Sequence, residues 1–322
     1  MSFVLKLIAT AAITLAASFN TVAFAKYPDK PIRFVVSFPP GSGTDTNARY
    51  TARRLQEKLG AVVTVENRPG GNSFMAVDQV VRAKPDGYTL LFSSNSPVST
   101  NVVMFKDLPY DPVKDLTPLA KLGYGAMGVA VPASSPTQNI EQLVEEGKKR
   151  PGQLNYGSGS ASYQIATELF LKQAGIEANH VPYRGASAAI TDLAGKQTDF
   201  VFADYGALIP LAQSNSIRVI AATGDKRLKQ APDVPTLQES GYKDYYMVNW
   251  VALFGPAGLP EDVQKVLSDA MVEIYSDQES IEFLDRMSWD VFPGDGKALA
   301  EFQQSEIKRW SDAAKQANIP QQ

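Results

Sequence analysis

Two short turns rich in glycine and hydroxyl side chains carry the residues best suited to binding chemistry. Gly41-Ser42-Gly43-Thr44 follows an apolar run at 32–37, and Gly157-Ser158-Gly159-Ser160 follows a second run that starts at Leu154. After each turn, apolar residues recur at helical spacing until a glycine, Gly60 or Gly175. Free backbone N–H groups at the start of a helix attract anions. Each turn therefore predicts a small anion site, suited to a carboxylate.

The same turns do not fit the common nucleotide-binding motifs. A Walker loop requires a lysine after its last glycine, and neither turn has one. A dinucleotide-binding turn requires a third glycine, but Thr46 and Ser162 stand at that position. The sequence therefore argues against nucleotide binding and predicts no cofactor. Thr44 and Asp45 are the expected N-cap residues of the helix after the first turn.

Catalytic and metal-binding patterns are weak. The chain has one histidine, His180, and no cysteine, so a zinc site would have to be completed by carboxylates. No Gly-x-Ser-x-Gly turn occurs, and a serine hydrolase would have to use His180. A structural histidine at the end of a strand is the favoured interpretation. We expect no catalytic residue and no metal site, and an exported hydrolase that depends on His180 is kept as a minor alternative.

Acidic and aromatic residues near the turns each have two interpretations. Asp204 ends the apolar run 200–203, at the strand end where open α/β sheets bind ligands, but it equally suits a helix N-cap. Asp45 is more readily explained as a cap than as a ligand contact, because a carboxylate repels an anion. Three aromatic residues, Tyr163, Tyr205 and Trp250, could line an apolar pocket or belong to the core.

The elements that must position these turns alternate between strand and helix patterns. Further strand patterns lie at 62–67, 86–94, 198–204, 217–224 and 248–260. Three helical patterns follow Glu261. This alternation predicts the α/β class, with a largely parallel sheet covered by helices on both faces. Two similar strand–turn–helix units, about a hundred residues apart, indicate one binding turn on each of two similar lobes.

Composition narrows the class of protein and its compartment. The 322 residues carry a net charge of −3 with no basic stripe, so we expect no nucleic-acid partner. Residues 1–25 combine Lys6, an apolar stretch and the small-residue site Ala23-Phe24-Ala25, which predicts a signal peptide cleaved after Ala25. A membrane anchor is the weaker alternative, because the apolar stretch is short. The absence of cysteine excludes disulfides and a lipid-modified N-terminal cysteine, and we expect a protein of the periplasm.

Eight ordered sequence blocks across the mature chain carry a family resemblance. They read YPDKPIRFVVSFPPGSGTDTNAR, VENRPGGN, PDGYTLL, LPYDPVKDLTPLA, GQLNYGSGSASYQIATELF, VPYRGASAAITDLAGKQTDFVF, PDVPTLQESGY and LFGPAGLP. In this order they resemble the substrate-binding proteins of tripartite tricarboxylate transporters, the Bug-type receptors. The resemblance implies a two-lobed periplasmic-binding-protein fold of type II, which closes on its ligand like a flytrap without catalysis. It also implies a small carboxylate ligand and an inner-membrane permease as partner, and we expect a monomer.

The resemblance further implies which residues face the ligand. They are Phe38, Gly41, Ser42, Thr44 and Asp45 of the first turn, Gly157, Ser158, Gly159, Ser160 and Tyr163 of the second, and Asp204. Ser42 stands where the family usually has a second glycine, and Tyr163 where it usually has histidine. These departures leave aliphatic and aromatic carboxylates both open.

Two crossings of the chain, near Gly125 and Tyr246, are expected to separate the lobes. The first lobe would comprise residues 26–125 and 247–322, and the second residues 126–246. A periplasmic sensor that presents its closed form to a signalling kinase would use the same architecture. Sensing is therefore the main alternative to transport.

Overall fold

The computed structural model describes residues 27–322, so the predicted signal peptide and its cleavage after Ala25 lie outside the described residues. Its strands are β1 (Ile32–Val36), β2 (Val63–Asn67), β3 (Thr89–Ser94), β4 (Leu116–Pro132), β5 (Leu154–Ser158), β6 (Ala178–Pro182), β7 (Phe200–Asp204), β8 (Ile217–Ala222), β9 (Val248–Pro256) and β10 (Trp289–Asp295). Its helices are α2 (Gly43–Leu59), α3 (Phe74–Val81), α4 (Asn101–Met104), α5 (Ile140–Lys149), α6 (Ala161–Ala174), α7 (Ala186–Ala194), α8 (Tyr205–Gln213), α9 (Glu261–Tyr275), α10 (Gln278–Asp285) and α11 (Gly296–Gln316). A short 3₁₀ turn, η1 (Gly71–Ser73), and a π-helical turn, η2 (Ser96–Thr100), complete the elements.

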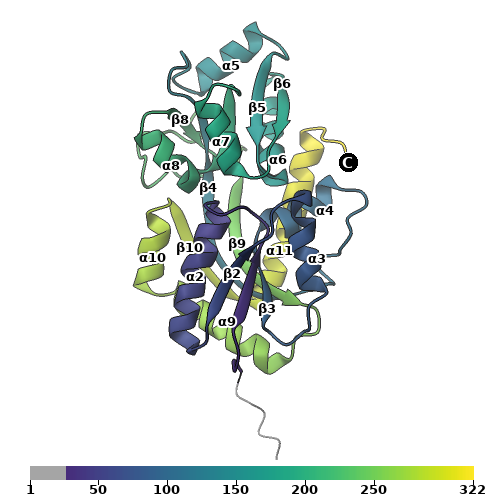
Figure 1. Ribbon diagram of the computed structural model, residues 1–322. Helices are drawn as coiled ribbons and strands as arrows, with labels where there is room; N and C mark the ends of the chain where they lie inside the picture. Colours follow the sequence, from purple (N-terminus) through teal and green to yellow (C-terminus); the bar gives the residue numbers. More distant parts are fainter. Residues whose placement is uncertain (1–26) are drawn as a thin grey trace, which may run out of the picture.

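The elements form two α/β lobes, one above the other in Figure 1, with β4 passing between them. The β1 lobe, drawn below, contains β1, β2, β3, β9 and β10 with helices α2, α3, α4, α9 and α10. The β5 lobe, drawn above, contains β5, β6, β7 and β8 with helices α5, α6, α7 and α8. The two-lobed α/β fold expected from the sequence is confirmed.

Strand β4 belongs to the sheets of both lobes. The strands follow the order β2-β1-β3-β9-β4-β7-β5-β6, and β8 and β10 also pair with β4. From Leu116 to Ala126, β4 pairs with β9, and β10 lies along its other edge. From Met127 onward, β4 pairs with β7 and β8. The partners of β4 therefore change between Ala126 and Met127, in the middle of one uninterrupted strand.

Parallel pairing is found at the centre of each lobe. β1 pairs in parallel with β2 and β3, and β5 pairs in parallel with β6 and β7. The pairs that involve β4 or β9 are antiparallel. The antiparallel pairing of β4 with β9 follows from the chain path, because β4 carries the chain from one lobe to the other and β9 carries it back.

Each lobe has its own hydrophobic core. In β1, Phe34 and Val35 are both fully buried but belong to different clusters, since successive side chains of a strand point to opposite faces of the sheet. Phe34 packs in the cluster that includes Leu267 of α9, and Val35 packs in the cluster that includes Val77 of α3. The β5 lobe contains one large cluster, which covers β4 from Met127 onward.

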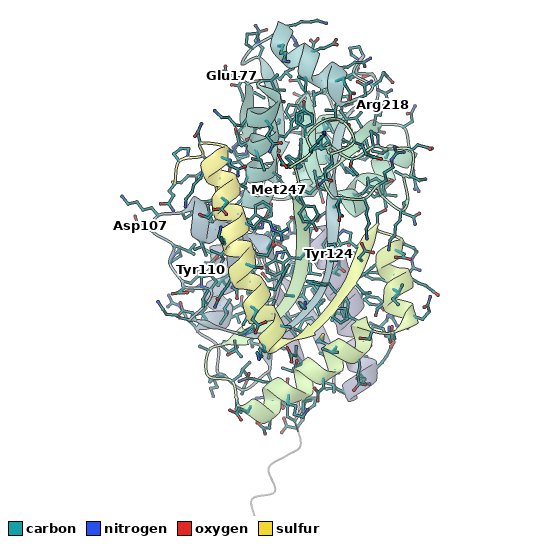
Figure 2. The ribbon with its side chains drawn as sticks, turned by 180° about the vertical axis from the view of Figure 1, so that it is seen from behind. Asp107, Tyr110, Tyr124, Glu177, Arg218 and Met247 are labelled. Atoms are coloured by element: carbon teal, nitrogen blue, oxygen red, sulfur yellow. The ribbon has the colours of Figure 1, made fainter. Side chains whose placement is uncertain are left out.

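The C-terminal helix α11 is shared between the two cores. Near its start Leu299 packs in a β1-lobe cluster, and three turns later Trp310 packs in the β5-lobe cluster. Figure 2 shows α11 from behind, running lengthwise past the level at which Tyr124 of β4 and Met247, just before β9, are labelled. The helix therefore braces the region where the chain crosses between lobes.

A buried carboxylate fixes this helix in place. Glu306 is 1% exposed and accepts hydrogen bonds from Nε1 of Trp250 on β9, at 3.0 Å, and from Nε1 of Trp310, at 3.1 Å. Burial raises the pKa of Glu306 above its ordinary value, although the charge of Arg309 and the two indole donors act in the opposite direction.

Gly125 of β4 provides a test of the packing at the crossing. A methyl group on its Cα would overlap the indole ring of Trp289, which is 2% exposed and cannot move aside at low cost. We expect Gly125→Ala to lower the free energy of unfolding by about 1–3 kcal/mol in urea denaturation. Gly195→Ala is the control, because its methyl group would meet only ordinary van der Waals contacts. Equal effects of the two changes would contradict this account.

The pH dependence of stability tests the state of Glu306. Its pKa is higher in the folded chain than in the unfolded chain, so its contribution is fully present at low pH and is lost as the pH rises through the folded pKa. Glu306→Gln keeps an oxygen acceptor for the indoles but does not titrate. Calorimetry should show the melting temperature of the wild type falling relative to the variant as the pH rises above the ordinary pKa of a glutamate. If the melting temperature of the wild type instead rose relative to that of the variant as the pH increased, folding would favour the charged form of Glu306.

Candidate functional site

The first turn is organised by reciprocal capping at the start of α2. Ser42 is the N-cap residue, and its hydroxyl accepts a hydrogen bond from the backbone N–H of Asp45 at 3.2 Å. The Asp45 carboxylate in turn accepts from the backbone N–H of Gly41 at 2.9 Å. The expectation that Thr44 or Asp45 caps the helix is wrong, because Ser42 has the extended backbone of a cap and α2 begins one residue later.

Asp45 is used entirely within its own lobe. Besides Gly41, its carboxylate is bonded by Arg49 at 3.0–3.1 Å and by Nδ2 of Asn67 at 2.8 Å. Burial opposes ionisation, but the hydrogen bonds from Arg49, Gly41 and Asn67 outweigh it and lower the pKa of Asp45. Asp45 therefore holds the turn in shape as a carboxylate.

The second turn leads into α6 in a similar way. Ser160 is the N-cap residue of α6, and its hydroxyl accepts from the backbone N–H of Tyr163 at 3.5 Å. Two residues earlier, at the end of β5, Oγ of Ser158 lies 2.7 Å from Nε2 of His180 on the adjacent strand β6. The helices end as the sequence predicts, at Gly60 and Gly175 in the left-handed conformation.

The two turns face each other across a narrow inner crevice between the lobes. The volume of the crevice that the centre of a water molecule can occupy is about 10 Å³. Its lining comes from both lobes and comprises Phe38, Ser42, Gly43, Thr44, Ser94, Asn95, Ser96, Ser160, Tyr163, Ala186, Asp204, Asn249 and Trp289. The N-terminal ends of α2 and α6 thus converge on one small polar space.

Asp204 of the β5 lobe reaches across this crevice to the start of α2. A methyl group on Gly43 would lie 2.7 Å from Oδ2 of Asp204, so only the absence of a side chain at Gly43 allows this approach. Oδ1 of Asp204 accepts a hydrogen bond from Nδ2 of Asn249 at 2.5 Å, and the hydroxyl of Tyr163 faces the same carboxyl group. Asp204 and Tyr163 are therefore one connected polar unit with Asn249.

Burial dominates the electrostatics of this unit. It raises the pKa of Asp204, with the hydrogen bonds from Asn249 and Tyr163 acting in the opposite direction. Burial and the nearby Asp204 charge raise the pKa of Tyr163 well above its usual range. Tyr163 is consequently a neutral hydrogen-bonding group, and the unit is suited to binding rather than to proton transfer at neutral pH.

Two buried amides in the crevice have unused hydrogen-bonding atoms. Nδ2 of Asn95, which is 1% exposed, has no hydrogen-bond partner among residues 27–322. The same holds for Oδ1 of Asn249, which is 4% exposed. Buried polar atoms in folded proteins are nearly always paired. Both residues line the crevice, so a polar molecule held there would find a donor and an acceptor beside it.

A wider outer cleft adjoins the inner crevice. It measures about 660 Å³, and Phe38, Ser96 and Ser160 line both spaces. The β1 lobe contributes Ser37, Phe38, Pro39, Pro69, Gly70, Asn72, Ser73, Met75, Ser96, Asn101, Met104 and Phe105. The β5 lobe contributes Ser158, Gly159, Ser160, Ala161, Gln164, His180, Pro182, Tyr183, Arg184 and Gly185, and Gln322 also lines the cleft. Such a volume is ordinary for a small-molecule site.

Most residues expected to face the ligand lie on these two spaces. Those that line the crevice or the cleft are Phe38, Ser42, Thr44, Ser158, Gly159, Ser160, Tyr163 and Asp204. Gly41, Asp45 and Gly157 do not line either space. Gly41 and Asp45 bond each other within the turn, and Gly157 is packed against Tyr183 and its neighbours inside the β5 lobe.

Several lining residues were not anticipated. Asn249 interrupts the otherwise apolar buried strand β9, and a polar residue in such a run is the signal that could have identified it. Asn95 and Ser96 directly follow β3, at the strand end where ligands bind in open sheets. Trp250, which suited either a pocket or the core, is in the core.

His180 does not complete a hydrolase site. It bonds Ser158 and stacks on Tyr156 with ring centres 5.1 Å apart, but no carboxylate of the described residues bonds its ring. Burial lowers the pKa of His180 below its ordinary value. A serine–histidine pair without an orienting acid lacks one member of the usual triad.

None of the helices within residues 27–322 has the length and apolar character needed to cross a bilayer.

Comparison with known proteins agrees with this geometry. Residues 47–319 match the family described as "Tripartite tricarboxylate transporter family receptor". The protein BugT of Bordetella pertussis is 29% identical over 312 residues, which cover 96% of this chain and 94% of BugT.

Two solved structures share the fold over most of their length. One is an R. palustris protein with adipate, which is 28% identical with a TM-score of 0.90 over 92% of this chain and 100% of that protein. The other is MatC from Rhodopseudomonas palustris with bound malate, 25% identical with a TM-score of 0.84 over 89% of this chain and 99% of MatC. On its sequence, its fold and its paired turns, this chain belongs to the tripartite tricarboxylate transporter receptor family, the Bug-type periplasmic receptors.

Proposed function

We propose that this protein is a periplasmic solute-binding receptor that captures a small carboxylate between its lobes. The observation that carries the proposal is the inner crevice, where two helix N-termini from different lobes converge beside the unpaired atoms of Asn95 and Asn249. Helix-terminal N–H groups supply positive potential without a lysine or arginine. The adipate and malate in the solved relatives support a carboxylate as the ligand.

In this proposal, binding works by closure of the lobes. A ligand stabilises the closed state only through contacts that the open state lacks. The predicted lobes, residues 26–125 with 247–322 and residues 126–246, would then move about the crossing strands. The change of partners along β4 between Ala126 and Met127 supports a hinge at the first crossing. The turns with Phe38, Gly41, Ser42, Thr44 and Asp45, and with Gly157, Ser158, Gly159, Ser160 and Tyr163, would act with Asp204 as the ligand-facing parts.

Export and delivery complete the proposed role. Residues 1–25 would direct the chain to the periplasm and be cleaved after Ala25, and the mature monomer would deliver its ligand to an inner-membrane permease of the tripartite tricarboxylate type. Uptake of the ligand by a strain that lacks the receptor distinguishes this role from sensing. Loss of uptake supports transport, whereas unchanged uptake with a lost transcriptional response supports a sensor.

A ligand screen tests the carboxylate class. The mature protein should melt at a higher temperature with at least one acid in a panel that contains adipate, malate, succinate, hexanoate, benzoate and benzene-1,4-dicarboxylate, because a ligand that binds only the folded state stabilises it by mass action. Uncharged amides of the same acids are the matched controls. A panel in which no acid raises the melting temperature would contradict the proposal.

Gly43→Val tests closure at the inner crevice. The added side chain would collide with Asp204 across the lobe interface, since the three atoms nearest to a Cβ at Gly43 all belong to Asp204. We expect ligand affinity to fall at least about tenfold in calorimetric titration, with a melting temperature close to that of the wild type without ligand. Thr46→Val, on an exposed position of the same helix, is the control and should bind normally. Wild-type affinity in Gly43→Val would show that the contact between Gly43 and Asp204 is not part of the bound state.

A further inference from the structure

We propose that Arg184 recognises a second anionic group of the ligand, so that the receptor selects elongated dicarboxylates over short acids and over monocarboxylates. The inference rests on the proposed function, because it assumes that one carboxylate is seated at the inner crevice. It assigns the outer cleft to the rest of the ligand.

The two spaces are suited to one elongated molecule. Phe38, Ser96 and Ser160 line both the inner crevice and the outer cleft, so the two spaces adjoin. A ligand seated between the turns can therefore extend into the outer cleft. The crevice has room for little more than one polar group, whereas the cleft measures about 660 Å³. A ligand body that extends beyond the first carboxylate therefore lies in the cleft.

Four large apolar side chains of the β1 lobe line part of the cleft. Met104 is 1% exposed, Phe38 and Phe105 are partly buried, and Met75 is 59% exposed at the surface. A large apolar side chain left this exposed beside a cleft is a place where an apolar ligand body can be covered. Methionine also adapts its shape to different partners. This wall fits a methylene chain or a ring between the two charged ends.

One charged side chain, that of Arg184, is a cation on the wall of the cleft. Within residues 27–322, no aspartate or glutamate side chain lines the cleft and Arg184 is the one lysine or arginine that does. Gln322, the last residue, also lines it, and an oxygen of its terminal carboxyl group accepts the backbone N–H of Lys106 at 2.9 Å. His180 also lines the cleft, but burial lowers its pKa, so it is neutral at pH 7. An anion that enters the cleft therefore meets one guanidinium and no carboxylate side chain among the described lining residues.

The guanidinium of Arg184 is available to such an anion. Arg184 is exposed, and no carboxylate of residues 27–322 forms an ion pair with it. The nearby Asp192 is engaged by the hydroxyl of Tyr183 at 2.8 Å. The backbone on either side of Arg184 is held, because Tyr183 donates its N–H to Ser158 and Gly185 contacts Pro39 of the β1 lobe. Arg184 thus projects from a fixed segment beside the lobe interface, where its planar group can bind a carboxylate in bidentate fashion.

Paired ligands and paired variants test the inference by calorimetric titration. Adipate and hexanoate share their six-carbon chain and differ in the second carboxylate, and benzene-1,4-dicarboxylate and benzoate form a second such pair. We expect the wild type to bind at least one diacid more tightly than its monoacid and more tightly than succinate. Arg184→Gln should weaken binding of that diacid about tenfold and change binding of the monoacid less than about twofold, since an exposed ion pair contributes modestly. Arg184→Lys should retain part of the preference.

Arg82→Gln is the matched control, because Arg82 is an exposed arginine of the β1 lobe that pairs with Asp78 and does not line the cleft. It should leave both ligands unaffected. Equal losses for diacid and monoacid in Arg184→Gln, or no loss for either, would overturn the role of Arg184. Tightest binding of succinate or of a monoacid would overturn the elongated dicarboxylate. If the wild type bound none of these acids, the proposed function itself would fail.

Discussion

The structure depends on a single strand that serves two sheets. β4 completes the sheet of the β1 lobe with one half of its length and the sheet of the β5 lobe with the other. Both cores are built on it, so the turns that precede α2 and α6 are each fixed relative to β4. Because β4 exchanges its partners on both edges between Gly125 and Gly128, it joins the two sheets through its own backbone. The position of the inner crevice follows from this arrangement.

At the crevice, each helix N-terminus is met by a group from the opposite lobe. Asp204 of the β5 lobe lies against the start of α2, and Oγ of Ser96, from the β1 lobe, accepts the backbone N–H of Ser162 in the first turn of α6 at 3.4 Å. The positive potential at the N-terminus of each helix is thus met by an oxygen atom from the opposite lobe. The same potential is what a ligand carboxylate would use. Closure and ligand recognition therefore draw on one set of backbone N–H groups.

The strand–turn–helix units could be predicted from local sequence because their determinants are local. An apolar run, a hydroxyl at the turn and a terminal glycine define β1 with α2 and β5 with α6, and the structure has both. The N-cap was assigned wrongly because Ser42 and Thr44 are chemically alike and only the backbone conformation separates them. Gly41 and Asp45 were assigned to the site from the family resemblance, and in the structure they bond each other within the turn.

Other features depend on contacts between distant segments and left no local signal. The division of β4 between two sheets is set by β7, β8, β9 and β10, which lie far along the chain. The partnership of Asn249 with Asp204 joins residues 45 positions apart. In the sequence Arg184 has no feature that distinguishes it from other surface arginines, and only the tertiary structure shows that it lines the cleft. The sequence thus predicts the fold and the two turns, and the tertiary structure decides which side chains the turns bring together.

The tryptophans give the molecule an intrinsic optical reporter. The sequence has three, and all of them lie where the lobes meet. Trp250 and Trp310 share the carboxylate of Glu306, and Trp289 covers Gly125 and lines the inner crevice. Indole emission depends on local polarity and on nearby quenching groups, so a change in the angle between the lobes would alter the emission of the unlabelled protein. Closure of the lobes, as proposed above, would therefore be followed in real time without an attached dye.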